Sequence, residues 1–474
     1  MPQNPPIFAV VLAGGKGTRM KSNRAKVLHT LCGVPMVNYA IEAITPLLPE
    51  KLSVVVGHQA EQVEAVLPPE AEPVLQKEQL GTGDAVRVAL ESIEEEEGIL
   101  LVVNGDGPLI SHRTLGELVE RHRAAEVGAT VLVAELPDPA GLGRVAEDAG
   151  VVRIVEEREA TEAEREIGLV NLGLYAFDLP EIRDALGRIG ADNSDGEVYL
   201  TDVLEVIGRR SRAVTYRLKD LEEANLVNDR AHLARAEEIL RRRILDAHMR
   251  NGVTVRDPTS THIEANVEIG RDTVILPGSL LRGETRVGSD CVVGPSTDLR
   301  DTVVGDGAQV EHSVGRGASI GVGAHAGPYA YLRPGTVLGA GAKVGAYCEV
   351  KNTRVGDGSK VPHLSYVGDT EIGEGANLGA GTITANYDGT NKNRTSIGDD
   401  VFTGVNTNLI APVTIGDGAY IGAGSVVNKD IPAGKLAVGM PARVIRDAPG
   451  KVPNKVSKES PEGDGKRPQT ETEG

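Results

Sequence analysis

The chain has 474 residues, of which 40% are hydrophobic and 25% charged, a balance that excludes wholesale disorder and favours two or three domains. Its formal charge of −18, from 50 Lys and Arg against 68 Asp and Glu, argues against a nucleic acid or an anionic membrane as the main partner. No apolar run approaches the ~20 residues that span a bilayer, and residues 1–6 lack a basic leader, so we expect a cytoplasmic protein.

The first half of the chain, up to about residue 228, alternates unbroken apolar runs with helix-like segments. Such runs predict buried parallel strands, because strands covered on both faces lack polar alternation; they span 7–12, 52–56 and 99–103. Helical patterns cover 35–44 and 85–97, and a charged amphipathic stretch over 229–249 predicts a connecting helix. Ligands of parallel sheets sit at the carboxyl ends of the strands, so the turns after residues 12 and 103 are candidate binding loops.

After residue 253 the hydrophobic period changes to six, with glycine following many of the apolar positions. Neither a helix nor an alternating strand has this period, whereas a β-helix of hexapeptide repeats has one inward residue per short strand. The three registers are Ile269, Ile275, Leu281, Val287, Val293 and Leu299; Val314, Ile320, Ala326, Leu332, Leu338, Val344 and Val350; and Ile397, Thr403, Leu409, Ile415, Ile421 and Val427. The segment 385–392 breaks the register and is expected to loop out, and the charged tail 448–474 is expected to be disordered.

A glycine-rich turn follows the first predicted strand, in the sequence Leu12-Ala13-Gly14-Gly15-Lys16-Gly17-Thr18-Arg19-Met20. Its free amides, supplemented by Lys16, Arg19 and Lys26, suit a phosphate group, although a plain structural turn is the alternative. Asp106 follows the strand at 99–103, and a single carboxylate there suits Mg²⁺ bridging nucleotide phosphates; a turn or helix-capping role is the alternative.

These residues carry a family resemblance. GGKGTRM, Lys26-Val27-Leu28, Leu80-Gly81-Thr82-Gly83 and Gly105-Asp106 resemble the sugar-phosphate nucleotidylyltransferases. With the hexapeptide half, residues 7–440 resemble the bifunctional N-acetylglucosamine-1-phosphate uridylyltransferase/glucosamine-1-phosphate acetyltransferase family. The resemblance implies an α/β fold: a Rossmann-like nucleotidylyltransferase domain (1–228), a helical linker (229–252), a left-handed parallel β-helix acetyltransferase domain (253–447) and a disordered tail (448–474).

For the first domain the resemblance implies a nucleotide-sugar site that carries Mg²⁺. The residues implied to bind the uridine nucleotide and the sugar are Leu12, Ala13, Gly14, Gly15, Lys26, Gln76, Gly81, Thr82, Asn104, Gly105, Asp106, Gly143, Glu156, Asn171 and Asn228. Asp106 and Asn228 are the implied metal ligands, and Arg19 is expected to neutralise phosphate charge. Asn104 departs from the family, which usually has tyrosine there, and Gly107 is also unusual.

For the second domain the resemblance implies an acetyltransferase site with His363 as the general base. A histidine on a β-helix is otherwise a surface or packing residue, so His363 depends on its neighbours for this assignment. Arg333, Lys351, Tyr366, Asn377 and Lys392 are implied to bind the acceptor sugar phosphate, and Ala380, Asn386, Tyr387, Val405 and Ala423 the acetyl-CoA. Val405 and Met440 replace polar or basic residues of the family, and Lys429, Arg443 and Arg446 are candidates to compensate.

The implied enzyme acetylates glucosamine 1-phosphate with acetyl-CoA and then transfers UMP from UTP to N-acetylglucosamine 1-phosphate, releasing pyrophosphate. Its product, UDP-N-acetylglucosamine, is a precursor of peptidoglycan and lipopolysaccharide. The resemblance also implies a homotrimer, with no nucleic-acid or membrane partner. Two alternatives stay open. A nucleotidylyltransferase for another hexose phosphate is disfavoured by His363, Lys351 and Arg333, and a non-enzymatic nucleotide-exchange subunit is disfavoured by Lys26 and Asp106.

Overall fold

The computed structural model describes residues 5–148, 151–191 and 196–448. The chain divides into two compact units, Met1–Gly317 and Ala318–Gly474. This division falls inside the repeat region, so the domain boundaries at 228/229 and 252/253 stay predictions. The tail expected to be disordered lies, apart from Ala448, outside the described residues.

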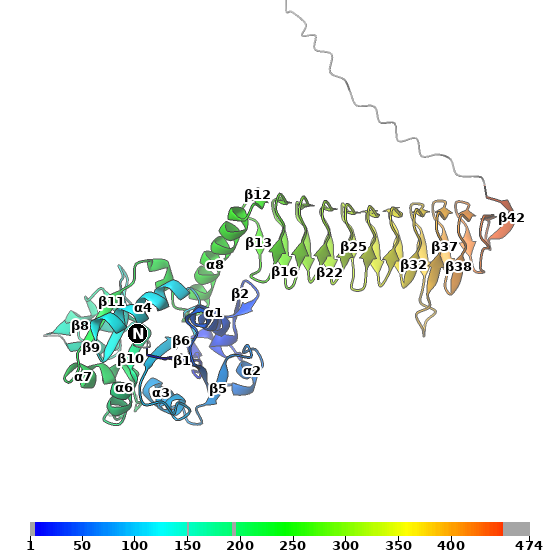
Figure 1. The fold of residues 1–474 in the computed structure, drawn as a ribbon. Coiled ribbons are helices and arrows are strands. Elements are labelled where there is room, and N and C mark those ends of the chain that lie inside the picture. The colour runs from blue at the N-terminus through cyan, green and yellow to red at the C-terminus, as the bar shows by residue number, and fades with distance from the viewer. Residues whose placement is uncertain (1–4, 149–150, 192–195, 449–474) are drawn as a thin grey trace, which may run out of the picture. The chain divides into compact units, whose positions relative to one another are not determined.

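The first unit begins with a mixed sheet in the order β11-β7-β10-β6-β1-β4-β5, with β8 paired to β10 and β9 paired to β8 (Figure 1). Its strands are β1 (Ile7–Leu12), β4 (Lys51–Val56), β5 (Glu72–Leu75), β6 (Ile99–Asn104), β7 (Ala129–Glu135), β8 (Arg144–Asp148), β9 (Val151–Val155), β10 (Leu169–Asp178) and β11 (Ala213–Arg217). The three strands predicted from apolar runs are confirmed as β1, β4 and β6, and β1 pairs in parallel with both of the others. β10 runs antiparallel to its neighbours β6 and β7, and β8 pairs antiparallel with β10 and β9.

Helices cover both faces of this sheet because its strands are apolar on both sides. Alternate residues of β6 divide between two cores: Leu101 packs with α1 and α4, and Leu100 packs with α3, α6 and α7. The helices are α1 (Met36–Ile44), α2 (Ala60–Glu64), α3 (Thr82–Leu90), α4 (His112–Ala125), α5 (Glu162–Arg165), α6 (Leu179–Leu186), α7 (Val203–Gly208) and α8 (Arg230–Arg250). A short hairpin of β2 (Thr30–Leu31) and β3 (Val34–Pro35) precedes α1.

Two helix predictions have different outcomes. The connecting helix is confirmed as α8, which begins where the Asp229 side chain accepts a hydrogen bond from the His232 amide. Its apolar residues Ala236 and Leu240 pack in a core with the β2–β3 hairpin. The helix predicted over 85–97 is wrong in its second half, because α3 ends at Leu90. Four consecutive glutamates at 94–97 would repel one another at the helix C-terminus, where the helix dipole disfavours negative charge.

The rest of the first unit forms coils of short strands, joined in three parallel ladders. These strands are β12 (Thr254–Val255), β13 (His262–Ile263), β14 (Glu268–Ile269), β15 (Val274–Ile275), β16 (Leu280–Arg282), β17 (Arg286–Val287), β18 (Val292–Val293), β19 (Asp298–Arg300), β20 (Val303–Val304), β21 (Gln309–Val310) and β22 (Val314–Arg316). The ladders within this unit run β12-β15-β18-β21, β13-β16-β19-β22 and β14-β17-β20.

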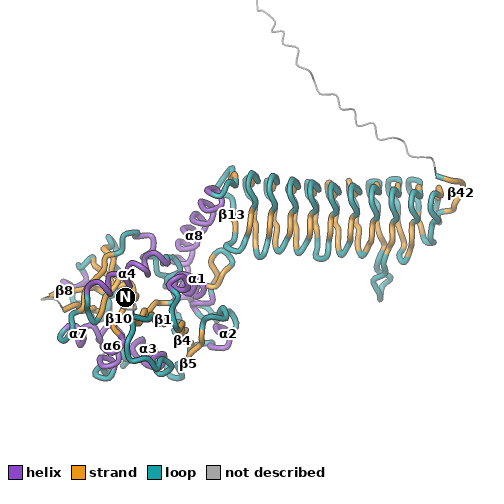
Figure 2. Tube along the Cα trace, in the orientation of Figure 1, coloured by secondary structure: helices purple, strands orange, loops and turns teal. Residues whose placement is uncertain are grey.

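The second unit has the same coil architecture, a parallel β-helix, as the hexapeptide period predicts (Figure 2). Its strands are β23 (Ser319–Ile320), β24 (His325–Ala326), β25 (Tyr331–Leu332), β26 (Val337–Leu338), β27 (Lys343–Ala346), β28 (Glu349–Lys351), β29 (Arg354–Val355), β30 (Lys360–His363), β31 (Tyr366–Gly368), β32 (Thr370–Ile372), β33 (Asn377–Leu378), β34 (Ile383–Ala385), β35 (Thr395–Ile397), β36 (Phe402–Thr403), β37 (Asn408–Ile410), β38 (Val413–Ile415), β39 (Tyr420–Ile421), β40 (Val426–Val427), β41 (Lys435–Val438) and β42 (Arg443–Asp447). The final pair, β41 and β42, is antiparallel.

The predicted inward residues are confirmed with one exception. Val314 aligns with the outward Asp298, and Gly315 takes the inward position opposite Leu299. A β-carbon on Gly315 would lie 2.8 Å from Leu299 Cδ2, so the leucine fills the space that a side chain at 315 would need. The insert at 385–392 does leave the coils, as predicted: it protrudes as a loop closed by a bridge between Tyr387 and Lys392 (Figure 2).

Candidate functional site

A pocket of about 600 Å³ in the first unit lies at the carboxyl ends of β1 and β6. The two strands lie side by side there, with Leu12 opposite Asn104 and the Gly105 amide donating to the Leu12 carbonyl at 3.0 Å. Predicted residues that line the pocket are Leu12, Ala13, Gly14, Gly15, Arg19, Lys26, Gln76, Gly81, Thr82, Asn104, Asp106 and Asn228. Sequence reasoning did not single out Gln79, Arg158 and Glu197, which also line it, because none belongs to a motif at a strand end.

Lys26 is placed by the glycine-rich turn. Gly17 has a φ of 59°, and a β-carbon there would lie 2.5 Å from Lys26 Cβ, so glycine is required for both conformation and space. Lys26 itself begins a short 3₁₀ turn, Lys26–Leu28, whose Val27 and Leu28 are buried. The apolar core thus holds this turn while the lysine amine reaches into the pocket.

The basic and metal-binding candidates converge on one point. Lys26 Nζ forms an ion pair with Asp106 Oδ2 and lies 3.3 Å from Asn228 Oδ1, which also accepts from Arg19 at 3.0 Å. The other carboxylate oxygen, Asp106 Oδ1, is buried and has no hydrogen-bond partner among the described residues. One orphaned carboxylate oxygen beside an amide oxygen fits a divalent cation that takes its remaining ligands from phosphates and water. Within the described parts of the chain, no three His, Cys, Asp or Glu side chains form a denser metal cluster.

Gly143, Glu156 and Asn171, which the resemblance assigns to the sugar, form a separate group: Gly143 directly precedes β8, Glu156 directly follows β9, and Asn171 lies on β10. The Asn171 amide donates to the Gly143 carbonyl at 2.9 Å, and a β-carbon on Gly143 would lie 3.5 Å from Glu156 Oε1. Burial, together with the Glu159 and Asp202 carboxylates, raises the pKa of Glu156. Gly143, Glu156 and Asn171 are not among the residues that line the 600 Å³ pocket.

Asn104 connects this group to the pocket. Its Nδ2 lies 1.9 Å from where a β-carbon on Gly173 would be, and the Gly173 amide donates to Asn171 Oδ1 at 3.0 Å. Position 173 must therefore be glycine, and Asn104, the residue that departs from the family pattern, packs against the residue whose amide is hydrogen-bonded to Asn171.

In the second unit a buried carboxylate, Asp369, organises the predicted acetyltransferase residues. Only 6% of Asp369 is exposed, and it accepts from Asn386 Nδ2 at 2.6 Å, Asn352 Nδ2 at 2.7 Å and Lys351 Nζ at 3.4 Å. Burial by itself would raise its pKa, but these hydrogen bonds and the Lys351 charge outweigh burial, so the pKa of Asp369 is lowered. Local sequence patterns do not identify Asp369, because its partners Lys351 and Asn386 come from different coils.

Gly368 allows two predicted side chains to meet above the backbone. A β-carbon there would lie 2.5 Å from Tyr366 Oη and 2.7 Å from Asn386 Nδ2, and these two atoms are 3.4 Å apart. Because β31 pairs with β28, Gly368 lies opposite Lys351. Tyr366, Asn386 and Lys351 are therefore brought together in the structure.

Three cations gather near this network. The Lys392 amine lies against Lys351, and this contact, followed by the Asp369 charge, raises the pKa of Lys351. The same contact with Lys351, assisted by the Arg333 charge, lowers the pKa of Lys392. Arg333 itself pairs with Glu349 at 2.7 Å. Lys392 comes from the protruding loop and the other two from successive coils, so a concentrated positive surface forms that suits an anion.

The remaining predicted residues lie on the surface of the coils. His363 is exposed, while its carbonyl is fixed by the Gly381 amide at 3.1 Å and the Ser365 hydroxyl at 2.8 Å. Asn377 on β33 pairs in register with Lys360, which lies on the same strand, β30, as His363. Ala380, Val405 and Ala423 stack on successive coils, linked by neighbouring amides that donate to the Ala380 and Val405 carbonyls, and Tyr387 and Met440 are exposed.

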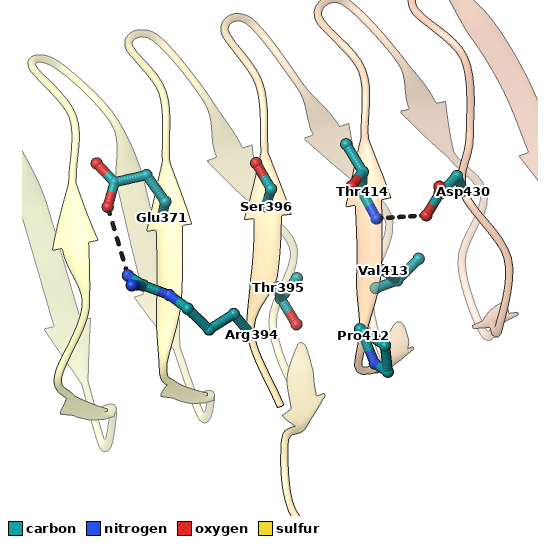
Figure 3. A pocket seen from close by; sticks show the side chains of 8 residues that line it. All are labelled: Glu371, Arg394, Thr395, Ser396, Pro412, Val413, Thr414 and Asp430. Carbon is teal, nitrogen blue, oxygen red and sulfur yellow. Dashed lines mark hydrogen bonds and ion pairs between the residues drawn. The ribbon is translucent and has the colours of Figure 1, made fainter. Parts of the chain in front are cut away.

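A second groove, of about 620 Å³, crosses the outer face of β32, β35 and β38 (Figure 3). It is lined by Glu371, Arg394, Thr395, Ser396, Pro412, Val413, Thr414 and Asp430. Arg394 pairs with Glu371 at 4.0 Å, and Asp430 accepts from the Thr414 amide at 2.8 Å. None of the predicted site residues lines this groove.

Among the helices in the described ranges, none is long and apolar enough to cross a membrane.

Comparison with known protein families first identifies the class of each of the two domains. Residues 9–164 match the MobA-like NTP transferase domain family, and residues 394–429 match the bacterial transferase hexapeptide family of six repeats. The chain therefore joins a nucleotidyltransferase domain to a hexapeptide-repeat transferase domain.

Full-length relatives then define the family. The chain is 79% identical over 466 residues to the bifunctional protein GlmU of Rubrobacter xylanophilus, covering 98% of both chains. It is 47% identical over 458 residues to the GlmU protein of Brevibacillus brevis, covering 96% of this chain and 99% of the relative. A solved UDP-glucose pyrophosphorylase bound to UDP-glucose aligns with 50% of this chain at 18% identity and a TM-score of 0.43, too low to support further conclusions. The chain belongs to the bifunctional GlmU family of uridylyltransferase/acetyltransferases, whose nucleotidyltransferase half uses a divalent metal.

Proposed function

We propose that this chain makes UDP-N-acetylglucosamine in two steps, in the cytoplasm, where UTP and acetyl-CoA are available. Acetyl transfer to glucosamine 1-phosphate comes first, and uridylyl transfer to the N-acetylated sugar phosphate follows. The observation that carries the proposal is that each unit concentrates cations at a separate candidate site. Lys26 and Arg19 meet at Asn228 in the first unit, and Lys351 and Lys392 meet beside Asp369 in the second.

In uridylyl transfer, an oxygen of the sugar 1-phosphate forms a bond to the α-phosphorus of UTP as the bond to pyrophosphate breaks. We propose that Lys26 and Arg19 neutralise phosphate charge and that the turn amides of Gly14 and Gly15 hold the triphosphate. Asp106 and Asn228 would hold Mg²⁺, which supplies charge neutralisation of the phosphates when bound. Gly143, Glu156 and Asn171 would position the sugar.

In acetyl transfer, the amine nitrogen of the sugar forms a bond to the thioester carbonyl carbon, and the carbon–sulfur bond of acetyl-CoA then breaks. His363 would take the proton from the amine, and the thiolate leaves and is protonated. Arg333, Lys351 and Lys392 would bind the phosphate of the acceptor, with Tyr366 and Asn377 at its hydroxyls. Asn386 and Tyr387 would lie near the acetyl group, and Ala380, Val405 and Ala423 would line the coenzyme A groove.

The acetyltransferase candidates are more exposed than those of the nucleotide pocket. We propose that further copies of the chain complete this site in a homotrimer built on the β-helix, since hexapeptide coils pack readily against copies of themselves. Sedimentation of the purified chain tests the proposal, and a monomeric chain with full acetyl transfer would contradict it.

Mass spectrometry of reactions containing UTP, acetyl-CoA and glucosamine 1-phosphate tests the two-step function. We expect UDP-N-acetylglucosamine with all three substrates, and only N-acetylglucosamine 1-phosphate when UTP is omitted. His363→Ala should lower acetyl transfer by about 10²–10⁴-fold at pH 7, the range for loss of a general base, and leave uridylyl transfer unchanged. Equal use of other hexose phosphates, or nucleotide binding without turnover, would favour one of the two alternatives instead.

A further inference from the structure

One buried carboxylate beside the nucleotide pocket is not used by the mechanism above. Asp84 lies in the first turn of α3 and is only 9% exposed. Its Oδ2 accepts from Gln76 Nε2 at 2.9 Å, and Gln76, which lines the pocket just after β5, is only 5% exposed. The same Nε2 donates at 3.1 Å to the Gly81 carbonyl. Both hydrogen atoms of the Gln76 amide are therefore committed to acceptors.

This arrangement fixes which end of the amide faces the pocket. If the amide were flipped, Gln76 Oε1 would face two oxygen acceptors, an arrangement that buried polar groups avoid. In the observed orientation Oε1 lies 3.4 Å from the position of a β-carbon on Gly14, itself a pocket residue. Gln76 therefore presents a hydrogen-bond acceptor, and not a donor, on the pocket side.

The Asp84 carboxylate is itself anchored. Its other oxygen accepts from Arg87 at 3.4 Å, and Arg87 also donates to the Leu186 carbonyl at 3.1 Å, at the end of α6. A carboxylate can only accept hydrogen bonds, so its contact with Gln76 has one possible sense. The hydrogen bonds that link the Leu186 carbonyl, Arg87 and Asp84 to Gln76 thus determine which end of the Gln76 amide faces the pocket.

We propose that Asp84 is a specificity-determining residue of uridylyl transfer, which acts by holding the Gln76 amide with its oxygen toward the nucleotide base. The proposal rests on the proposed function, in which the pocket that Gln76 lines together with Gly14 and Gly15 binds UTP. Uracil carries an N–H donor at N3, whereas cytosine has a lone pair there, so an acceptor attracts the first base and repels the second. Discrimination of this kind is strong, because a mismatched base leaves a buried polar group unpaired.

The test compares three nucleotides in full-length variants. UTP and dTTP share the N3–H donor and CTP lacks it, so kcat/KM is measured for each with saturating N-acetylglucosamine 1-phosphate. Asp84→Ala releases one of the two contacts on Gln76 Nε2 and should lower the UTP-to-CTP ratio by about 10-fold, with dTTP following UTP. Asp84→Asn is the matched control: its Oδ1 can still accept from Gln76, so the ratio should stay near that of the unmodified chain.

A merely structural role would slow all three nucleotides by the same factor, and that result would overturn the proposal. So would a ratio that falls equally in Asp84→Asn and Asp84→Ala, because the acceptor would then be irrelevant. Should Asp84→Ala fail to fold, Asp84→Leu gives the second test, since leucine is branched like aspartate but has no acceptor for Gln76 Nε2, and the ratio should fall. If the unmodified chain turns over no UTP, the proposed function fails, whereas equilibrium binding of UTP and CTP to the same variants still tests Asp84.

Discussion

The two candidate sites are built in opposite ways. In the first unit the polar groups project from loops at the carboxyl ends of adjacent parallel strands, so they converge on a pocket in which the Lys26 and Asp106 side chains are 15% and 22% exposed. In the second unit they are stacked on successive coils, and His363 and Lys392 lie on the exposed surface. In the sheet, site residues lie close together because neighbouring parallel strands end at the same edge. In the β-helix, they lie close together because residues in register stack on successive coils.

This difference affects how each site depends on the rest of the chain. The pocket is complete within Met1–Gly317, where helices pack on both faces of the sheet that supports it. The acetyltransferase candidates depend on Asp369, a single buried carboxylate that ties Lys351 to Asn386. Damage to the two sites should therefore separate cleanly.

Truncation should have the largest effect. A fragment of residues 1–317 should keep uridylyl transfer and lose acetyl transfer completely, because Arg333, Lys351, His363 and Lys392 are all absent.

A fragment of residues 1–251 should also keep uridylyl transfer and lose acetyl transfer, since α8 packs on the hairpin core, but it should unfold at a lower temperature. It loses the Ala265 amide that donates to the Cys32 carbonyl at 3.0 Å. Parallel activity assays and thermal unfolding measure this, and an inactive yet folded 1–317 fragment would contradict the separation of the two sites.

Asp106→Asn is the sharpest single change in the pocket. It removes the charge that pairs with Lys26 and the orphaned oxygen available to a cation. Uridylyl transfer should fall by about 10³-fold or more, in keeping with several kcal/mol of lost metal-dependent stabilisation. Acetyl transfer by the same preparation serves as the control. Near-normal synthesis of UDP-N-acetylglucosamine from N-acetylglucosamine 1-phosphate would remove Asp106 from the metal site.

The sequence predicted what local pattern determines and missed what distant contacts determine. Asp106 was found because it directly follows an apolar strand, and Thr403 because it keeps the period of six. Gly315 was missed because it stacks on Leu299 after 16 residues, whereas three hexapeptides per coil predict 18, and no local sequence pattern indicates the shorter coil. Asp84 and Asp369 were missed because a buried carboxylate acquires its role only from partners that folding brings to it.

Asp369→Asn tests the dependence on register in the second unit. Loss of the charge should release Lys351 and Asn386, and acetyl transfer should fall by about 10- to 100-fold, the scale for hydrogen bonds to charged groups. Uridylyl transfer should not change. Asp400→Asn is the matched control, because both residues have positive φ at corners of the coils, 52° and 53°, where asparagine is tolerated. Equal losses in both variants would mean that any corner aspartate matters, not Asp369 in particular.

The smallest expected effect concerns acid stability, which should differ between the units. His122 on α4 is 4% exposed and contacts Thr130 Oγ1 at 3.0 Å; burial, followed by the Arg123 charge, lowers its pKa to about 4. In the unfolded chain this histidine binds a proton near pH 6.5, so between pH 6.5 and 4 the unfolded state holds more protons and the first unit loses stability as pH falls. The loss approaches about 3 kcal/mol at pH 4. For Asp369 the lowered pKa acts in the same sense but in a more acidic range: its stabilisation is complete above the ordinary aspartate pKa and is lost as pH falls through the lower pKa of the folded state. Urea unfolding of the 1–317 fragment at pH 7 and pH 5, with His122→Asn as the comparison, measures the difference. The variant should lose less stability on acidification than the unmodified fragment, and an identical loss in both would exclude His122 as its source.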